Sequence, residues 1–325
     1  MTLDLSFTAE DVANTRFAIS PLWEVVASVR VLKEPTGLNR PWAERVRRRL
    51  ADVDWKLLSD LVPVPTVSLV CFISPPPASA VPDLELELAG LLAAAHEVRD
   101  QLDAWRYGGP RTPRVQALHD DPATGLARLA DEIRAYWAAA IAPYWPRIRS
   151  LCEGDVLYRA KLLAQDGVRG MLTGLDENVR WQGERLRLDH RFCHGTRTLD
   201  GRGLLLVPSV FTWPRIFSIT VPPFQPTLRY SPRGIATLWE HREHDPPQAL
   251  AAVLGRTRAR LLASLDQPAS TRELAVRTGL SEPGASQHLT ALRRAGLCSA
   301  HRTGRYVLYA RTAVAEALLA GDAHA

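Results

Sequence analysis

The chain has 325 residues, of which 46% are hydrophobic and 23% are charged. At roughly 100–200 residues per domain this length predicts two domains, and the composition is that of an ordinary globular protein. This composition excludes disordered and collagen-like proteins. A disulfide-stapled protein is excluded because the four cysteines show no paired spacing. The N-terminus has no apolar segment of the signal-peptide type, and the longest uncharged stretch, residues 61–82, holds six prolines. We therefore expect a cytoplasmic protein without a membrane span.

The formal net charge of +5 is confined to one end of the chain. Residues 1–245 hold 30 basic and 30 acidic side chains, whereas residues 246–325 hold ten arginines and five acidic residues. A small basic module attached to a neutral body is the charge distribution expected of a nucleic-acid-binding domain.

The N-terminal third predicts a short strand followed by helices. Apolar and polar residues alternate over 3–7, and Thr8 with Asp11 forms a capping-box pattern that begins a helix. Ser20 and the proline after it begin a second, apolar helix that we expect in the core. Residues 42–61 are also expected to be helical.

That last helix contains a basic run, namely Arg45, Arg47, Arg48 and Arg49. Such a run is typical of a solvated helix face. A second contact with nucleic acid is the alternative interpretation.

The remainder of the first domain alternates between apolar strand-like and amphipathic helical segments. We expect a strand over 64–73, helices over 84–105, 125–141 and 153–166, and strands over 184–192, 203–207, 216–221 and 227–230. The predicted fold class is therefore α+β, with a mostly helical N-terminal domain, residues 1–245, that includes a small antiparallel sheet. The segment 244–247, with its two prolines, is the predicted linker.

Residues 246–325 predict a winged helix-turn-helix domain. A first amphipathic helix over 250–265 precedes a capping box at Ser270 and Glu273, which begins a short helix that Gly279 ends. Ser281 caps the next helix. Two short helices joined by a glycine turn indicate a helix-turn-helix, and the alternating residues 298–310 predict a hairpin beside it. A last short helix is expected over 312–320.

This segment resembles the arsenic-repressor (ArsR) family of bacterial transcription factors. The motifs that carry the resemblance are Leu254-Gly-Arg-Thr-Arg258, Glu273-Leu-Ala-Val, Ser286-Gln-His-Leu289, Leu292-Arg-Arg-Ala-Gly-Leu297 and Gly304-Arg-Tyr-Val-Leu-Tyr309. Residues 1–245 resemble a domain of unknown role that precedes such modules in actinobacteria, and that resemblance implies no activity.

By this resemblance, Glu282 to Arg294 is the recognition helix that enters the major groove of double-stranded DNA. Gln287 suits an adenine edge, Glu282 could accept from cytosine, and Arg293 is placed to reach phosphate. Arg302 and Arg305 flank the turn of the wing. The candidate DNA contacts are Ser281, Glu282, Ser286, Gln287, Thr290, Arg293, Arg302 and Arg305.

Metal sensing, which many family members perform through paired cysteines, is not expected here. The matching positions hold Ala275 and Arg277, neither of which supplies a thiolate. The other ligand-type residues are His190, Cys193, His194, His241 and His244, and we expect His190 to be a core histidine. No cofactor, metal or catalytic residue is therefore predicted.

The sequence thus predicts a DNA-binding transcriptional regulator, a repressor that binds a pseudo-palindromic operator as a homodimer, and not an enzyme. The N-terminal domain would provide part of the dimer interface or, through some of its nine tryptophans, a pocket for a small-molecule effector. Two alternatives remain: a ligand-binding or protein-interaction protein whose winged helix does not bind DNA, and an enzyme domain fused to a regulator.

Overall fold

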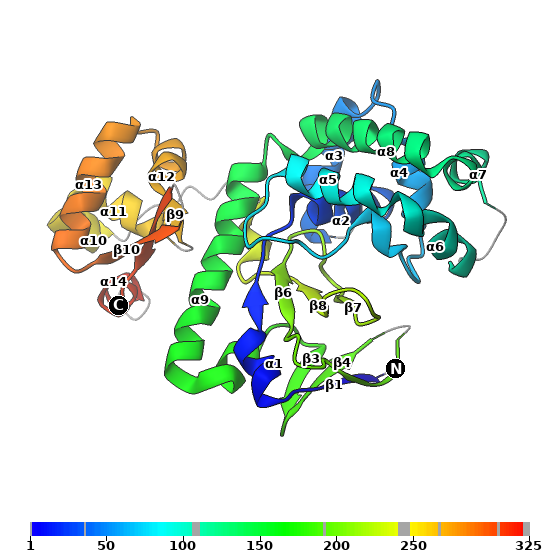
Figure 1. Ribbon diagram of the computed structural model, residues 1–325. Coiled ribbons are helices and arrows are strands. Elements are labelled where there is room, and N and C mark those ends of the chain that lie inside the picture. Colours follow the sequence, from blue (N-terminus) through cyan, green and yellow to red (C-terminus); the bar gives the residue numbers. More distant parts are fainter. Residues whose placement is uncertain are drawn as a thin grey trace. The chain divides into compact units, whose positions relative to one another are not determined.

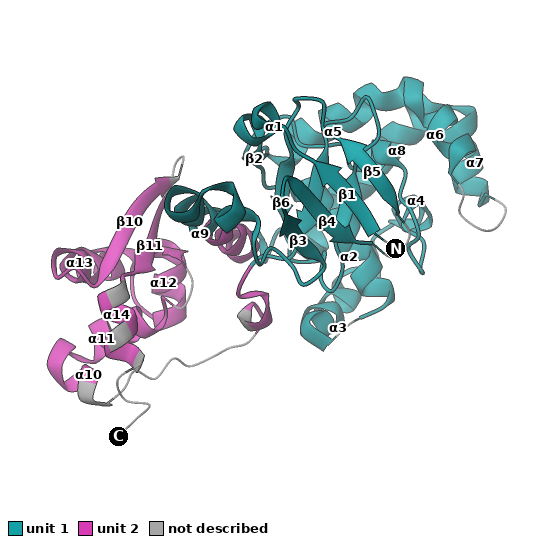
Figure 2. Ribbon diagram, turned by 90° about the horizontal axis from the view of Figure 1, so that it is seen from below, with its two compact units in different colours: residues 1–145, 156–232 teal, residues 146–155, 233–325 magenta. Residues whose placement is uncertain are grey.

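The computed structural model divides into two compact units, which Figure 2 colours separately. Unit 1 comprises residues 1–145 and 156–232, and unit 2 comprises residues 146–155 and 233–325. The structure describes residues 2–35, 37–105, 111–190, 193–239, 248–265, 268–303 and 306–320. The predicted linker, residues 244–247, lies outside the described residues.

Unit 1 begins with a strand and continues mainly as helices (Figure 1). The helices in the first part of unit 1 are α1 (Ala9–Asn14), α2 (Pro21–Lys33), α3 (Arg40–Arg49) and α4 (Lys56–Leu61). They are followed by α5 (Leu84–Ala93), α6 (Val98–Ala104), α7 (Pro113–Asp120), α8 (Pro122–Tyr136) and α9 (Trp145–Leu172). Helix α9 passes from one unit into the other, and Gly167, at φ 66°, interrupts its helical backbone.

The strands of unit 1 form two four-stranded sheets. The first has the order β3-β4-β1-β5, with β1 (Thr2–Ser6), β3 (Val179–Gln182), β4 (Arg185–Asp189) and β5 (Gly195–Thr198). The second has the order β2-β6-β8-β7, with β2 (Arg16–Phe17), β6 (Leu205–Pro208), β7 (Phe217–Ile219) and β8 (Thr227–Tyr230). Both are mixed, because β1 pairs with β4 antiparallel and with β5 parallel, and β8 pairs with β6 parallel and with β7 antiparallel.

Helix α2 lies at the centre of unit 1, with every residue from Pro21 to Leu32 buried. Its buried Glu24 accepts hydrogen bonds from the backbone N–H of Val210 at 2.8 Å and from the hydroxyl of Ser209 at 2.9 Å. Its buried Arg30 donates to the carbonyl of Phe211 at 2.7 Å. Both side chains therefore fix the segment that follows β6, and the Arg30 Nε atom is buried there without a hydrogen-bond partner.

The predicted α+β class is confirmed, and the expected strand over 3–7 is β1. The small antiparallel sheet expected in this domain is wrong: two mixed sheets form, because β1 and β6 each have a parallel neighbour. The capping box at Thr8 and Asp11 is present, as is the Ser20 cap of α2. The strand expected over 64–73 is wrong: only a short 3-10 helix, Cys71–Ile73, forms there. Pro63 and Pro65 lack the N–H that a strand ladder needs, so their apolar neighbours pack as a loop. Helix α7 was not predicted.

Unit 2 contains a helix-turn-helix and a three-stranded sheet of order β10-β11-β9. Its helices are α10 (Gln248–Leu254), α11 (Arg256–Ala263), α12 (Thr271–Thr278), α13 (Glu282–Arg294) and α14 (Ala313–Ala320), and its strands are β9 (Ala269–Ser270), β10 (Cys298–Thr303) and β11 (Tyr306–Arg311). The single helix expected over 250–265 is divided at Gly255, whose φ of 84° is outside the helical region. Leu262, Leu274, Leu289, Leu297 and Tyr309 belong to one apolar cluster that joins these elements.

Candidate nucleic-acid interface

The two short helices of the helix-turn-helix begin and end at strong local signals. The hydroxyl of Ser270 accepts from the N–H of Glu273 at 3.3 Å, and the Glu273 carboxylate accepts from the N–H of Ser270 at 2.9 Å. This reciprocal capping box begins α12, and Gly279, at φ 70°, ends it in the left-handed conformation that glycine adopts without strain. The turn to α13 therefore begins at Gly279.

Helix α13 presents one face to the core and the opposite face to solvent. Ala285, Leu289 and Leu292 are buried at helical spacing. The predicted contacts on this helix lie elsewhere around it: Glu282, Ser286, Gln287 and Arg293 are exposed, and Thr290 is half-buried. Glu282, Ser286, Thr290 and Arg293 follow the i, i+4, i+8, i+11 spacing of one helix face. Four of the predicted contacts of α13 therefore share one side of the helix, and Gln287, exposed one residue after Ser286, lies about 100° further around it.

Ser281 directly precedes α13 and caps this helix. Its hydroxyl oxygen accepts from the N–H of Gly284 at 3.2 Å and so caps α13. The cap uses the oxygen as an acceptor, which leaves the O–H as the group able to donate to a phosphate. The sequence predicted both the cap and the contact.

Glu282, in the first turn of α13, lies beside an arginine that sequence reasoning did not select. The Arg272 Nε atom of α12 lies 3.6 Å from the Glu282 Oε1 atom, and both side chains are largely exposed. A carboxylate repels DNA phosphates, so a neighbouring guanidinium reduces that repulsion where the helix would enter the groove. The exposed position of Arg272 at the start of a capped helix was the signal in the sequence that could have identified it.

The wing is a hairpin in which Cys298 pairs with Arg311 and Thr303 with Tyr306. Leu308 and Tyr309 are both buried, although consecutive strand residues point to opposite faces, and β9 pairs with β11 through Ala269 and Tyr309. Arg302 is exposed near the end of β10. Arg305 lies outside the described residues.

Two of the arginines that make this module basic are used inside it. Arg311 donates from its Nε atom to the carbonyl of Leu262 at 2.8 Å, and Arg277 donates to the carbonyl of Ser264 at 3.1 Å. Both guanidinium groups stabilise the C-terminal end of α11, where the carbonyls of a helix have no intrahelical partners. The net charge of the module therefore overstates the number of cations available to a phosphate backbone.

The thiol of Cys298 is placed as a core residue of the winged helix. Cys298 is buried beside the Leu289 carbonyl, and burial raises the pKa of its thiol to about 11. A thiol with such a pKa is a poor nucleophile and a poor metal ligand at neutral pH. Ala275, at a position where relatives of the predicted family would carry a cysteine, is also buried.

Some of the histidines that the sequence offered as possible metal ligands lie within the described residues, and others do not. His190 lies after β4, and its Nε2 atom is 2.9 Å from the Ser218 hydroxyl, which satisfies this half-buried ring. His241 and His244 lie outside the described residues. Within the described part of the chain, no group of three His, Cys, Asp or Glu residues is arranged to hold a metal.

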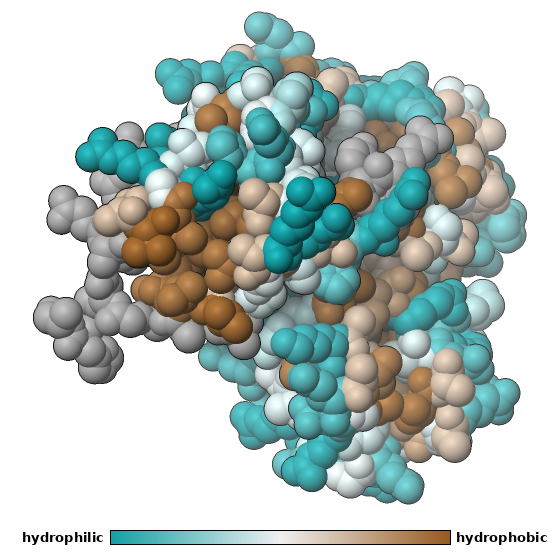
Figure 3. Space-filling model, turned by 90° about the vertical axis from the view of Figure 1, so that its left-hand side faces the viewer, coloured by the Kyte–Doolittle hydropathy of each residue, from teal (hydrophilic) through white to brown (hydrophobic). Residues whose placement is uncertain are grey.

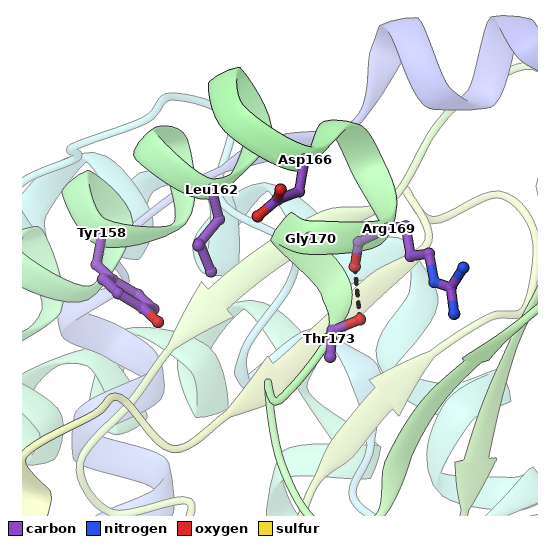
Figure 4. A pocket seen from close by; sticks show the side chains of 6 residues that line it. All are labelled: Tyr158, Leu162, Asp166, Arg169, Gly170 and Thr173. Atoms are coloured by element: carbon purple, nitrogen blue, oxygen red, sulfur yellow. Dashed lines mark hydrogen bonds between the residues drawn. The ribbon is translucent and has the colours of Figure 1, made fainter.

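A shallow hollow of about 340 Å³ lies beside the end of α9 in unit 1 (Figure 4). Tyr158, Leu162 and Asp166 line it from before the break at Gly167, and Arg169, Gly170 and Thr173 line it from after the break. Tyr158 is the one aromatic side chain among these six residues. Trp23 and Trp42, which the sequence offered for an apolar pocket, are instead fully buried in the core.

Comparisons with known proteins agree with the geometry of unit 2. Residues 256–300 match the family of bacterial regulatory proteins described as the arsR family, and residues 78–234 match a family of unknown function (DUF5937). No curated protein and no solved structure matched the chain. The first match runs from the start of α11 into β10, so the resemblance predicted from the sequence is confirmed. Among the described residues, no helix is long and apolar enough to cross a membrane.

Proposed function

We propose that this chain, which carries an arsR-family DNA-binding domain, is a sequence-specific transcriptional repressor that binds a pseudo-palindromic operator as a homodimer in the cytoplasm. The observation that carries the proposal is the exposed face of α13, where Glu282, Ser286, Gln287 and Arg293 lie together on a helix held by its own caps. A helix presented in this way fits the major groove.

The proposed contacts divide into those that specify sequence and those that position the protein. Gln287 pairs with an adenine edge and Glu282 accepts from a cytosine amino group, because these side chains match the donors and acceptors of those bases. Ser281, Ser286 and Thr290 donate to phosphates or bases near the start and middle of the helix. Arg293, on a later turn, and Arg302, on the wing, bind the phosphate backbone.

An energy argument supports two copies of the chain on one operator. A single module buries only about 600–1,000 Å² against DNA, and each good base contact contributes about 1–3 kcal/mol of discrimination. That is too little to select one operator from a genome. Two copies related by a two-fold axis double the contacts, and such dimers are the commonest oligomers.

Unit 2 also has apolar side chains that a second copy could cover (Figure 3). Leu250 of α10 and Ala315 of α14 belong to the core cluster of the unit, while Val253, Val314 and Leu318 of the same two helices are 81%, 59% and 45% exposed. Contiguous exposed apolar surface typically marks an interaction site. We propose that this surface forms one part of the dimer interface and that unit 1 supplies another.

The test of DNA binding is a gel shift and a footprint with the promoter region of the protein's own gene, repeated over a range of salt concentrations. Binding through phosphates releases counterions, so affinity should fall steeply with salt. Changing Arg302 and Arg305 together to Ala should weaken binding to every duplex and flatten the salt dependence. An unchanged salt slope would remove the wing from the interface.

Light scattering at micromolar concentration tests the homodimer. Replacing the exposed Val253 and Leu318 by Ser should shift a dimer toward monomer, whereas the same replacement at the exposed Val221 of unit 1 serves as the control. A full-length monomer that footprints one half-site with nanomolar affinity would contradict the proposal.

The same binding experiment tests the first alternative. A winged helix that serves only protein contacts would leave all promoter DNA unbound, and its arginines would be a solvated surface. A small-molecule effector that binds unit 1 stays a prediction. It would be supported if adding a fraction of cell metabolites made the protein dissociate from its promoter DNA.

A further inference from the structure

Helix α3 of unit 1 is the most basic surface helix in the described part of the chain outside unit 2. It holds five arginines among ten residues, Arg40, Arg45, Arg47, Arg48 and Arg49, with Glu44 as the one acidic residue. Trp42, Ala43 and Val46 are buried and fix which side of the helix faces the core. The opposite side therefore carries the charge.

The five arginines do not share one environment. Arg47 donates to the carbonyl of Leu32 at 3.1 Å, and the Arg49 guanidinium lies 5.6 Å from the centre of the Tyr144 ring. Arg40 and Arg48 are exposed and Arg45 is half-buried. Within the residues that the structure describes, no ion pair joins any of these three to an acidic side chain. We call Arg40, Arg45 and Arg48 the α3 arginine face.

Helix stability explains only part of this arrangement: Glu44, exposed on the same side, is four residues from both Arg40 and Arg48, a favourable spacing for opposite charges. Cations are favourable in the last turn of a helix, which accounts for Arg47, Arg48 and Arg49. Arg40 is instead the first residue of α3, where the helix dipole disfavours a positive charge. Arg45 and Arg49 add a like-charge pair at i, i+4 spacing, which is also unfavourable.

We propose that the α3 arginine face binds DNA phosphates as a second, sequence-independent contact of the chain, an inference that rests on the DNA-binding function proposed above. Eight residues separate Arg40 from Arg48, which places them about 12 Å apart along the helix axis. Over that length a duplex presents about seven phosphate charges. Guanidinium groups suit phosphates because their planar donors match the phosphate oxygens. Once unit 2 is on its operator, the covalent link keeps α3 near a high concentration of such phosphates.

The test compares two triple variants of the full-length chain. The first is Arg40→Gln with Arg45→Gln and Arg48→Gln. The control is Arg128→Gln with Arg134→Gln and Arg180→Gln, which removes the same charge from exposed arginines that already have acidic partners. The measured quantity is the slope of log affinity against log salt concentration, on promoter DNA and on an unrelated duplex.

The α3 variant should reduce the magnitude of that slope by about 0.9 for each lost phosphate contact, so by about 2–3, and by the same amount on both duplexes. The control should keep the wild-type slope. Arg→Lys at the three α3 positions retains the charge and should restore most of it. Equal slopes for the α3 variant and the control would overturn the inference. It would also be overturned if the α3 variant lost binding to an acidic protein while its salt slope on DNA stayed that of the wild type. The proposed function fails separately, if the wild-type chain binds no DNA.

Discussion

Unit 1 buries several ionisable side chains whose pKa values burial shifts, whereas unit 2 keeps most of its arginines at the surface. In unit 1, Glu24, Arg30 and Arg229 are all buried, and Arg229 donates to the Ser74 carbonyl while its guanidinium stacks 4.0 Å from the centre of the Trp23 ring. In unit 2, Arg272 and Arg293 stay exposed around α13. The difference shows two uses of charged residues in this chain: Glu24, Arg30 and Arg229 fix loops inside unit 1, whereas Arg272 and Arg293 belong to an outward surface of unit 2.

Removing a buried charged group should therefore cost far more stability than removing an exposed one. Glu24→Ala leaves the N–H of Val210, the N–H of Phe211 and the Ser209 hydroxyl without their acceptor. Each buried donor without a partner costs about 1–3 kcal/mol, so we expect the free energy of unfolding to fall by at least about 3 kcal/mol. Glu44→Ala, at an exposed position of α3, is the control and should change it by less than about 0.5 kcal/mol. Denaturant unfolding measures both, and equal effects would remove the contrast between the units.

The buried carboxylates should also make stability depend on pH. Burial raises the pKa of Glu24 and of Glu87 to about 7 each. Between about pH 4.5 and 7 the folded chain therefore holds protons that the unfolded chain has released, and its free energy of unfolding falls as pH rises. Glu24→Gln removes one of these groups and should flatten the decline. The measurement is the melting temperature of the wild type and of the variant across this pH range. If the two melting temperatures fell in parallel, Glu24 would be ionised throughout.

A smaller effect is expected at the start of α12 in unit 2. Ser270→Ala removes one half of the capping box and should destabilise the module by about 1 kcal/mol. Ser286→Ala is the matched control, because Ser286 is exposed within α13 and alanine favours a helix. Hydrogen exchange of the α12 amides would locate the loss. Equal protection in the two variants would mean that packing alone holds the helix.

The smallest effect is expected from metals and thiol reagents. Ala275 and Arg277 supply no thiolate, and the buried Cys298 has a raised pKa. Zinc, cadmium or arsenite added to the protein–DNA complex should therefore leave it intact. Stoichiometric release, with the metal located on α12, would show that this module senses metals by another set of ligands.

The sequence predicted unit 2 more closely than unit 1 for a physical reason. The signals that define α12 and α13 are local: Ser270 and Glu273 are three residues apart, and Ser281 directly precedes the helix that it caps. The helix that the family resemblance gave as the recognition helix, Glu282 to Arg294, has the same bounds in the structure.

In unit 1 the decisive contacts join residues that are distant in the sequence. Glu24 and Ser209 are 185 residues apart, and Trp23 donates to Thr212 across 189 residues. No local pattern reveals such pairs. The ion pair of Arg272 with Glu282 was missed for a similar reason, since it joins two helices.

The most direct test of the central claim, that the exposed face of α13 reads DNA, is a footprint of the wild type and of Gln287→Ala on the promoter of the protein's own gene. The wild type should protect two half-sites about 34–36 Å apart. The variant should lose discrimination at one base pair in each half-site, by about 1–3 kcal/mol per contact, while its binding to unrelated DNA stays the same. No protection by the wild type, or the same base preference in both proteins, would contradict the account.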